Sequence, residues 1–573
     1  MFYKKDHRTG YLFDPRDSFS PKRRALLNNS WATLFREKIL AGLPVEELKD
    51  SFDPDFGRPT KELHMIMGAL ILQQMLDLTD HETIKNIAFN MEWHYALNIN
   101  GESDKEAYLC PKTLWSMQKL FSDLEMEDDI FDNVNDVLSR AFDVDTTKQR
   151  IDSIHIKSNM RHIGRIRIIA ETIKKFLKNL KRHHKGLFDK LPPELVERYT
   201  NEREFSSFTL FKPSESEKTL VSVCVDLFNL SLRFSNHLKV KKMDSYGLLL
   251  RVLDEQCVIN GDDVSPKPAK DVPANSVQNP SDPDATYDAH KGKGYQVQVM
   301  ETYTEEKDDK TLNLITYVEV EQAHESDAHA LIPALESTKE RGLFPDEVLA
   351  DSLYGSDENC EKSKEMGVEV VSPVMGKDEE SDVTLSDFEL SDKGRVVNCP
   401  RGHPPVYYKV KKTRHSVGFD PDTCSSCPLA SECPARPGKK YYYLRFDDKA
   451  MRLSRRRANE KTKEFKDRYR MRTGIEATMS EYDRLTGVKE LRVRGKGPVR
   501  FVAKLKVVGV NLLRALRVQN ARKRDVPAPY GLSYVLFEIS SIFKERFRFI
   551  WGKFQKTFTP PALNYKFSPK MAV

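Results

Sequence analysis

Apolar residues change their spacing along the chain, and each change predicts a different kind of element. Between residues 58 and 120 they recur every three or four positions, as at Met65, Ala69 and Leu72, which predicts helices. A further helix is predicted over 112–123. We expect an all-α N-terminal domain here, with Lys and Arg at its edges. Such a bundle could bind DNA or could serve only for dimerisation or packing, because periodicity does not separate these roles.

Short runs rich in β-branched residues predict strands farther along the chain. Two helical stretches, 325–341 and 356–366, separate the later runs. Hairpin-like strands followed by alternating helices and strands indicate a mixed sheet flanked by helices. The predicted strands cover 150–158, 295–304, 312–322, a run that ends at Asp351, and 368–374.

The first predicted strand is separated from the others by a long helical insertion, about 160–257. The insertion begins with the basic run RHIGRIRIIAETIKKFLKNLKRHHK, 161–185. Such a run is most often a solvated helix face, but dense Lys and Arg with few acids also suit contacts with phosphate groups. The Pro-, Asp-, Ser- and Asn-rich stretch 258–284 is predicted to be a linker.

Composition narrows the class of protein. The chain has 573 residues, of which 39% are hydrophobic and 31% charged, with a net charge of +6. This describes a folded, charge-rich protein of two to four domains. The first ten residues contain no apolar signal-peptide core, and the apolar window 65–78 is too short to span a bilayer. A cytoplasmic protein that does not enter a membrane is therefore expected.

Four of the eight cysteines fall within 35 residues. Two Cys separated by two residues can hold one tetrahedral ion, and two more can complete the set, with His403 as a possible substitute. The alternative is four unrelated reduced thiols. A closed set of this kind would make a structural zinc site that folds a small insertion. The predicted ligands are Cys399, Cys424, Cys427 and Cys433.

Three acids stand in positions from which they could converge. The segment VLADSLYGS, 348–356, places Asp351 directly after apolar residues typical of a strand end. Asp in such a position often only caps a helix or starts a turn. Asp152 lies in the first predicted strand, and Glu476 in a late helix. In a mixed sheet whose first and fourth strands are neighbours, these three carboxylates can meet.

The third acid lies in a predicted helix over 469–485, where Tyr469, Arg472 and Glu476 share one face. An exposed Arg–Glu helix pair is the simpler interpretation. The surrounding region, 436–524, is strongly basic, however, which suits an acid that works on a polyanion. Three carboxylates can hold two Mg²⁺ ions, which activate a nucleophilic oxygen and stabilise a leaving oxygen in phosphodiester chemistry.

These motifs resemble a known family. IDSIHIKSN around Asp152, ADSLYGS around Asp351 and the spacing of Tyr469, Arg472 and Glu476 resemble the three blocks of insertion-sequence DDE transposases, whose catalytic domain has an RNase H-like fold. The resemblance covers roughly residues 55–520. Other parts of the chain are similar to family segments: 57–84 to the N-terminal helical domain, 282–297 to the segment before a strand, 399–433 to a cysteine-containing insertion, and 487–516 to the basic closing segment.

The resemblance implies a metal-dependent DNA transposase of a bacterial insertion sequence. It implies catalysis by Asp152, Asp351 and Glu476 with two Mg²⁺, for which Mn²⁺ can substitute, and structural Zn²⁺ at the cysteines. The partners would be the inverted repeats at the element ends and target DNA, bound by a homodimer or larger complex. Residues expected to contact DNA are Tyr469, Arg472, Arg484, Arg492, Arg494 and Lys496.

The chain departs from the family pattern at one site position. The family usually has a Lys seven residues after the Glu, where this chain has Asp483, with Arg484 beside it. Glu481 does not fit the Tyr and Arg spacing and is a weaker third acid, and Asp284 receives no role. Two alternative functions stay open: a catalytically inactive or domesticated DNA-binding protein, and a nuclease or resolvase of RNase H-like fold that cuts without strand transfer.

The expected fold is α/β and multi-domain, with an RNase H-like mixed sheet. The predicted domains are an N-terminal extension (1–57), a helical N-terminal domain (58–145), an RNase H-like catalytic domain (146–376 plus 440–520, with the helical insertion about 160–257 and the linker 258–284), a four-cysteine insertion (377–439) and a C-terminal tail (521–573).

Overall fold

A computed structural model describes most of the chain. The C-terminal tail beyond residue 524 and residues 377–382 of the predicted cysteine insertion lie outside the described part. No helix in that part is long and apolar enough to cross a bilayer. The described residues are 1–8, 19–54, 56–101, 103–206, 208, 215–305, 308–376, 383–391 and 394–524.

The N-terminal region is helical, as the periodicity predicts. The most buried of its helices is α3, Leu63–Met75, of which all residues but Gln74 are buried. Residues 21–51, part of the predicted extension, are also largely helical and contribute Phe35, Leu40 and others to the same core. The helices are α1 Pro21–Asn28, α2 Trp31–Leu34, a π-helix Phe35–Ile39, 3₁₀ helices Leu40–Gly42 and Val45–Ser51, α3, α4 Asp80–Phe89, α5 Met91–Ala96, α6 Asp104–Ala107, α7 Pro111–Asp123 and α8 Met126–Phe142.

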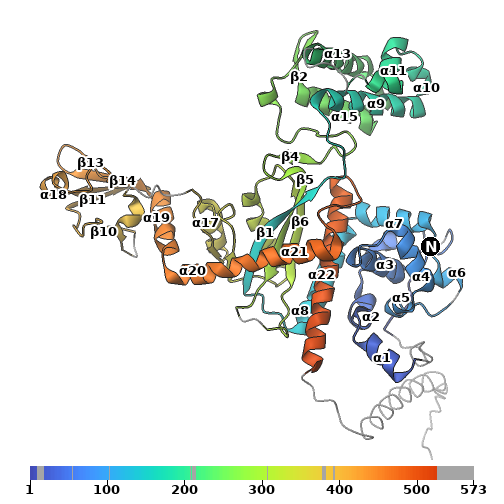
Figure 1. The fold of residues 1–573 in the computed structure, drawn as a ribbon, viewed down its shortest axis with the longest axis horizontal. Helices are drawn as coiled ribbons and strands as arrows, with labels where there is room; N and C mark the ends of the chain where they lie inside the picture. Colours follow the sequence, from blue (N-terminus) through green and yellow to red (C-terminus); the bar gives the residue numbers. More distant parts are fainter. Residues whose placement is uncertain are drawn as a thin grey trace, which may run out of the picture.

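A six-stranded mixed sheet forms the centre of the molecule (Figure 1). Its order is β4-β5-β1-β7-β8, and β6 also pairs with β5. β1 runs antiparallel to β5 and parallel to β7, which is parallel to β8. The predicted mixed sheet is thus confirmed. The strands are β1 Lys148–Lys157, β4 Thr286–Asp288, β5 Gly292–Thr302, β6 Ile315–Gln322, β7 Glu347–Leu349 and β8 Glu369–Val371, with a 3₁₀ helix Asp327–His329 and helices α16 Leu331–Glu340 and α17 Asp357–Glu365 between the later strands.

The segment between β1 and β4 is a helical lobe with its own core, drawn at the top of Figure 1. Its basic helix α9, Arg165–His183, buries residues such as Ile169 and Phe176 and turns Lys and Arg outward. The predicted linker 258–284 contains a β-hairpin, so its first part is not a structureless connection. The other elements are α10 Lys185–Phe188, α11 Pro193–Thr200, α12 Glu202–Ser206, α13 Ser216–Phe234, α14 Leu238–Lys241, α15 Asp244–Gln256, β2 Cys257–Asn260, β3 Asp263–Pro266 and a 3₁₀ helix Ala269–Asp271.

The cysteine segment forms a second lobe, drawn at the left of Figure 1, around a four-stranded antiparallel sheet of order β11-β12-β14-β13. Its core is small and centres on Val417, Phe419 and Leu444. Its elements are a 3₁₀ helix Leu385–Asp387, β9 Glu389–Leu390, β10 Val396–Asn398, β11 Tyr407–Lys411, β12 Arg414–Phe419, α18 Pro421–Ser425, β13 Arg436–Pro437 and β14 Tyr442–Asp447.

The C-terminal helices follow the cysteine segment and pack against the central sheet and the N-terminal helices. The long helix α22, Lys496–Arg524, packs against α3, α8 and β6, so one apolar core joins the N-terminal helices to one face of the sheet. α19, Asp448–Glu460, leads to α20, Lys463–Tyr469. A 3₁₀ turn, Arg470–Thr473, then separates α20 from α21, Gly474–Thr486. The predicted helical stretch over 469–485 is therefore confirmed, with one 3₁₀ turn within it.

Candidate functional site

Asp152 and Asp351 lie side by side because their strands pair in a fixed register. β1 and β7 are parallel neighbours, and the last paired residues are Arg150 and Leu349. Two residues farther along each strand are Asp152 and Asp351. Since adjacent strands lie about 4.8 Å apart, the two carboxylates emerge next to each other. Burial raises the pKa of Asp152, and the negative charge of Asp351 adds to that rise.

The local sequence explains why Asp351 stands at the strand end. Val348, Leu349 and Ala350 are fully buried and hold the strand against the core. The Asp351 carboxylate then accepts the Ser352 N–H, and its carbonyl accepts the Tyr354 N–H at 3.1 Å. Asp351 is therefore a turn residue, as the simpler interpretation holds. Its side chain is only half-buried, so this turn also presents the carboxylate beside Asp152.

Arg472 connects the first acid to the third. Its Nη2 lies 2.8 Å from Oδ2 of Asp152, and its Nη1 lies 3.9 Å from Oε1 of Glu476. The Arg472 side chain is 16% exposed, and its buried Nε has no hydrogen-bond partner among the described residues, whereas Glu476 is 69% exposed. Tyr469 is nearby: burial raises its pKa, and it feels the charges of Arg472, Asp351 and Asp152. The structure thus brings these five predicted residues into one neighbourhood.

The acid site carries side chains of the kind that bind Mg²⁺. Its donors are carboxylate oxygens, the ligands that hard cations prefer. Among the described residues, the one group of three metal-ligating side chains with ligand atoms within 4.8 Å of one another lies elsewhere. Here the Arg472 guanidinium stands between Asp152 and Glu476 as their counter-charge. The donor chemistry fits the ions, and Arg472 would have to release Oδ2 of Asp152 for an ion to bind there.

The turn that carries Arg472 is fixed by a buried ion pair. Arg150, two residues before Asp152, donates through Nη1 to the Met471 carbonyl at 2.7 Å. Its Nε and Nη2 lie 2.8 and 2.7 Å from Glu301, which is fully buried. Gly474 opens α21 because a Cβ there would lie 2.0 Å from Arg150 Nη1. Arg150 of β1 thus holds the 3₁₀ turn between α20 and α21 in place.

The same buried carboxylate anchors the middle of α21. Thr478 donates to Glu301 at 2.8 Å, and Arg514 of α22 lies 2.8 Å from it. Arg514 also lies 2.7 Å from Glu481, the weaker candidate for the third acid, which is thereby already paired. β1, β5, α21 and α22 are thus tied together through Glu301.

Sequence reasoning missed one further acid near the site. Asp327 has a side chain that is 9% exposed, lies 3.2 Å from Lys291 and accepts from Gln298 at 2.8 Å. Its charge contributes to the raised pKa of Asp152. No motif marks Asp327. Arg150 and Glu301 could have been suspected, because charged residues inside predicted central strands need partners.

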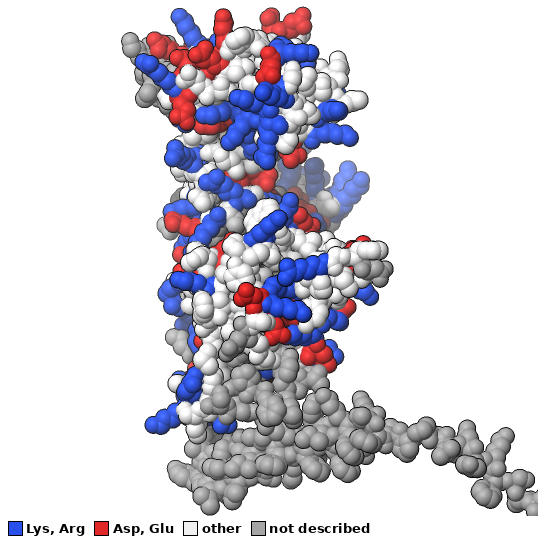
Figure 2. All heavy atoms as spheres, turned by 90° about the vertical axis from the view of Figure 1, so that its right-hand side faces the viewer, with Lys and Arg blue, Asp and Glu red and all other residues white. Residues whose placement is uncertain are grey.

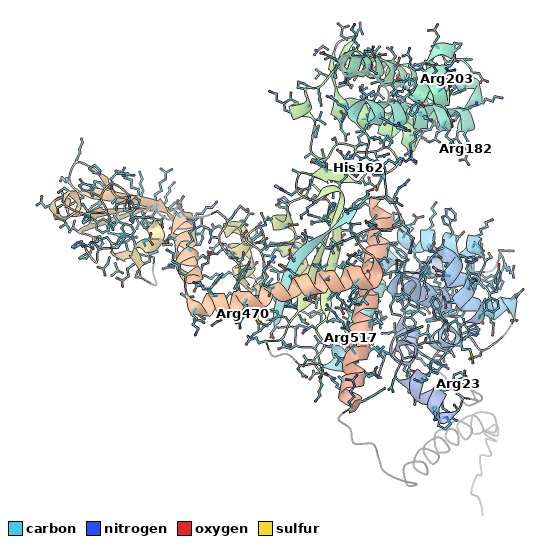
Figure 3. The ribbon with its side chains drawn as sticks, viewed as in Figure 1. Arg23, His162, Arg182, Arg203, Arg470 and Arg517 are labelled. Carbon is cyan, nitrogen blue, oxygen red and sulfur yellow. The ribbon has the colours of Figure 1, made fainter. Side chains whose placement is uncertain are left out.

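The remaining predicted DNA-contacting residues are exposed. Arg492 lies 3.0 Å from Asp77 of the N-terminal region, and Arg494 donates to the Asn159 carbonyl. The backbone N–H of Lys496 donates to Asp284 at 3.2 Å, so Asp284 anchors this loop. Arg484 is exposed near the end of α21. Figure 3 labels two further Arg residues of the basic C-terminal helices: Arg470, in the turn before α21, and Arg517, in α22.

The four predicted cysteine ligands line one hollow of about 220 Å³, together with His403. Burial and the three neighbouring thiols raise the pKa of Cys424 to about 11. Burial, Cys427 and Cys399 likewise raise the pKa of Cys433. Four thiols that influence one another in this way suit a tetrahedral ion. The donor set fits zinc, although no three of these sulfurs lie within 4.8 Å of one another.

Two family models match the chain. Residues 398–516 match the model described as Transposase DDE domain, and residues 23–120 match Transposase domain (DUF772). The first range contains the cysteine segment, Arg472 and Glu476, and the second most of the N-terminal helices. No curated protein and no solved structure matches the chain. The two models support the resemblance of the sequence to insertion-sequence DDE transposases.

Proposed function

We propose that this chain is the transposase of a bacterial insertion sequence, with an RNase H-like catalytic domain. It would bind the terminal inverted repeats of its element, cleave the DNA there and join the freed 3′ ends to target DNA. The observation that carries the proposal is the strand register that sets Asp152 beside Asp351. The order of the sheet, three antiparallel strands followed by two parallel ones, supports the assignment of the fold.

Asp152, Asp351 and Glu476 would hold two Mg²⁺, or Mn²⁺ in their place. Bound ions would activate the attacking oxygen and stabilise the leaving oxygen of the scissile phosphodiester. Arg472 balances the charge of Asp152 at 2.8 Å. Once released from this contact, it would be placed to bind a DNA phosphate, which an Arg can do in a bidentate manner. Tyr469 would support the same position.

Several basic surfaces would supply contacts with the phosphate backbone. The predicted loop residues Arg492, Arg494 and Lys496, with Arg484 nearby, are exposed. Arg492 and Arg494 line a hollow of about 840 Å³ against the N-terminal helices. Figure 2 shows further Lys and Arg side chains gathered on the helical lobe, interspersed with acidic ones. Such contacts give affinity without sequence preference, and their strength falls with salt.

The remaining parts of the proposal concern partners and the cysteine segment. Cys399, Cys424, Cys427 and Cys433 would hold a structural Zn²⁺. Two DNA ends must be held together for transposition, so a homodimer or larger complex would act. The protein would work in the bacterial cytoplasm, associated with the nucleoid.

Two alternative functions differ in what they require of the acid site. A DNA-binding protein without catalysis needs the basic surfaces but not the paired acids. A nuclease would cut DNA but would form no joined product. The register of Asp152 and Asp351 and the counter-charge from Arg472 favour a catalytic site over a binding protein. Formation of a joined product separates a transposase from a nuclease.

The test is a cleavage and strand-transfer assay on DNA that carries the element ends, with Mg²⁺. The Asp351→Asn variant should lose cleavage by about 10³-fold, since a ligand carboxylate is lost from a site that stabilises charge. Asp346→Asn is the matched control, because Asp346 lies exposed just before β7. Equal cleavage by wild type and Asp351→Asn would overturn the proposed mechanism. Cleavage without joined product would favour the nuclease.

A further inference from the structure

A cluster of metal-ligating side chains lies far along the chain from the acids and the cysteines. His7, Glu62 and His64 each offer one ligand atom, and these atoms lie within 4.8 Å of one another. His7 Nε2 lies 3.2 Å from Oε2 of Glu62, and His64 Nδ1 lies 3.0 Å from Oε1. All three side chains are at most 8% exposed. Two imidazoles and a carboxylate are a ligand set typical of zinc.

The hydrogen bonds around His7 are incomplete. Within the described part of the chain, its buried Nε2 has no hydrogen-bond partner of acceptable geometry, although Glu62 is close. Its Nδ1 lies 3.0 Å from Nδ2 of Asn98. In that arrangement the amide donates to Nδ1, so the ring proton sits on Nε2, where Glu62 Oε2 lies at 3.2 Å but outside good hydrogen-bond geometry. Such an unpaired buried donor is uncommon in folded proteins.

Turning over the Asn98 amide removes this conflict. Its Oδ1 would then accept a proton from Nδ1, and Nε2 would carry a lone pair directed at the cluster. A metal-ligating His is commonly held in this way, with its second nitrogen donating to a neighbouring oxygen. Asn98 is buried and has a positive φ of 56°, so its backbone holds an uncommon conformation at this position.

Hydrogen bonds also orient the Glu62 carboxylate so that one of its oxygens can bind an ion. As the N-cap of α3, it accepts the N–H groups of Lys5 and His64 on Oε1 and that of Met65 on Oε2. Oε2 therefore keeps a lone pair on the side of His7. Glu62 and Asn98 also line a hollow of about 730 Å³, which would leave room beside Glu62 for a water ligand of the ion.

We propose that His7, Glu62 and His64 bind one Zn²⁺, which fastens the N-terminal segment 1–8 to the start of α3. The helices that begin with α3 form the core against which α22 packs. The ion would therefore stabilise the N-terminal region, independently of the acid site and of the cysteines. Without an ion, the same residues would form a purely hydrogen-bonded attachment of the segment.

The test counts metal ions on the full-length chain. In the background used, Cys399→Ser and Cys424→Ser remove the proposed thiolate site, and Asp152→Asn and Asp351→Asn remove the proposed acid site. The protein is loaded with Co²⁺ after treatment with a chelator. This background should bind one Co²⁺ whose absorption lacks the intense thiolate charge-transfer band. Adding His7→Gln and His64→Gln should abolish that ion, whereas adding His162→Gln, at an exposed position of the helical lobe, should leave it. Equal Co²⁺ binding by all three proteins would overturn the proposal.

A second measurement guards against variants that fail to fold. Crystals of the wild-type chain grown with Zn²⁺ should show an anomalous peak between His7 Nε2, Glu62 Oε2 and His64 Nδ1. A well-ordered cluster without a peak at saturating Zn²⁺ would show that the attachment is hydrogen-bonded only.

Discussion

The acid site and the cysteine segment both carry candidate metal ligands, but different forces hold those ligands in place. Asp152 and Asp351 stand on paired strands of the central sheet, next to residues such as Ile151 and Ala350 that are fully buried. The cysteines stand on turns around a small core that includes Val417 and Phe419. The acids are placed by the fold before any ion binds. The cysteine segment has a small apolar core, so we expect it to depend on a bound ion for folding.

Removal of zinc should have the largest effect, and it should unfold the cysteine segment while the central sheet stays folded. Structural zinc contributes on the order of 10 kcal/mol of binding free energy at neutral pH, more than so small a core can replace. Hydrogen exchange with and without a chelator should show loss of protection in β11, β12 and β14. Protection in β1 and β5 should stay unchanged and serves as the internal control. Unchanged protection in both regions would mean that the cysteine segment folds without metal.

Glu301→Gln should damage the acid site and spare the cysteines. The substitution leaves Arg150 and Arg514 buried without their common carboxylate, and breaking a buried pair costs roughly 3–5 kcal/mol. Denaturant unfolding of the chain should report this loss. Glu305→Gln is the matched control, since Glu305 is 60% exposed and pairs with Lys148 at the surface, where such pairs contribute roughly 0–1 kcal/mol. Equal losses from both substitutions would contradict the anchoring role of Glu301.

Arg472→Gln should shift the pH dependence of cleavage. Burial raises the pKa of Asp152, and the positive charge of Arg472 opposes that rise. Removing the charge should raise the pKa further, so a smaller fraction of Asp152 is ionised and able to bind metal at a given pH. The acidic limb of the pH–rate profile should therefore move to higher pH, and Arg472→Lys should move it less. A profile that does not move, or moves to lower pH, would mean that Arg472 does not act on Asp152.

Arg492→Ala should have the smallest effect. Arg492 is 57% exposed, so its loss should change the free energy of unfolding by roughly 0.5 kcal/mol or less. If it contacts a phosphate, the slope of log affinity against log salt should decrease by about 0.9. Binding to element ends and to unrelated DNA should weaken alike. A loss confined to element ends would indicate base recognition instead.

The sequence predicted those parts of the fold that depend on local pattern. The β-branched run around Asp152 and the apolar run before Asp351 predicted their strands. Periodicity placed Tyr469 and Glu476 on one helix. It did not reveal that Arg150, more than 300 residues earlier, donates to the Met471 carbonyl in the 3₁₀ turn between α20 and α21. Interactions between distant residues leave no local signal.

The same limit applies to the candidate sites. The acids and cysteines were found because their residue types and spacings carry chemical meaning. Asp327 was missed because only the folded sheet brings it near Asp152. His7 and Glu62 were missed because 54 residues of chain separate them, and neither belongs to a motif. The predicted domain boundary at residue 57 also falls within a region whose helices share one core with those that follow.

The most direct test of the central claim is an anomalous diffraction measurement on crystals of the chain soaked with Mn²⁺. The account predicts anomalous density bridging the carboxylates of Asp152 and Asp351, with Arg472 withdrawn from Asp152 and Glu476 turned towards the ions. Saturating Mn²⁺ with no density at this pair, and Arg472 still bound to Asp152, would contradict the account.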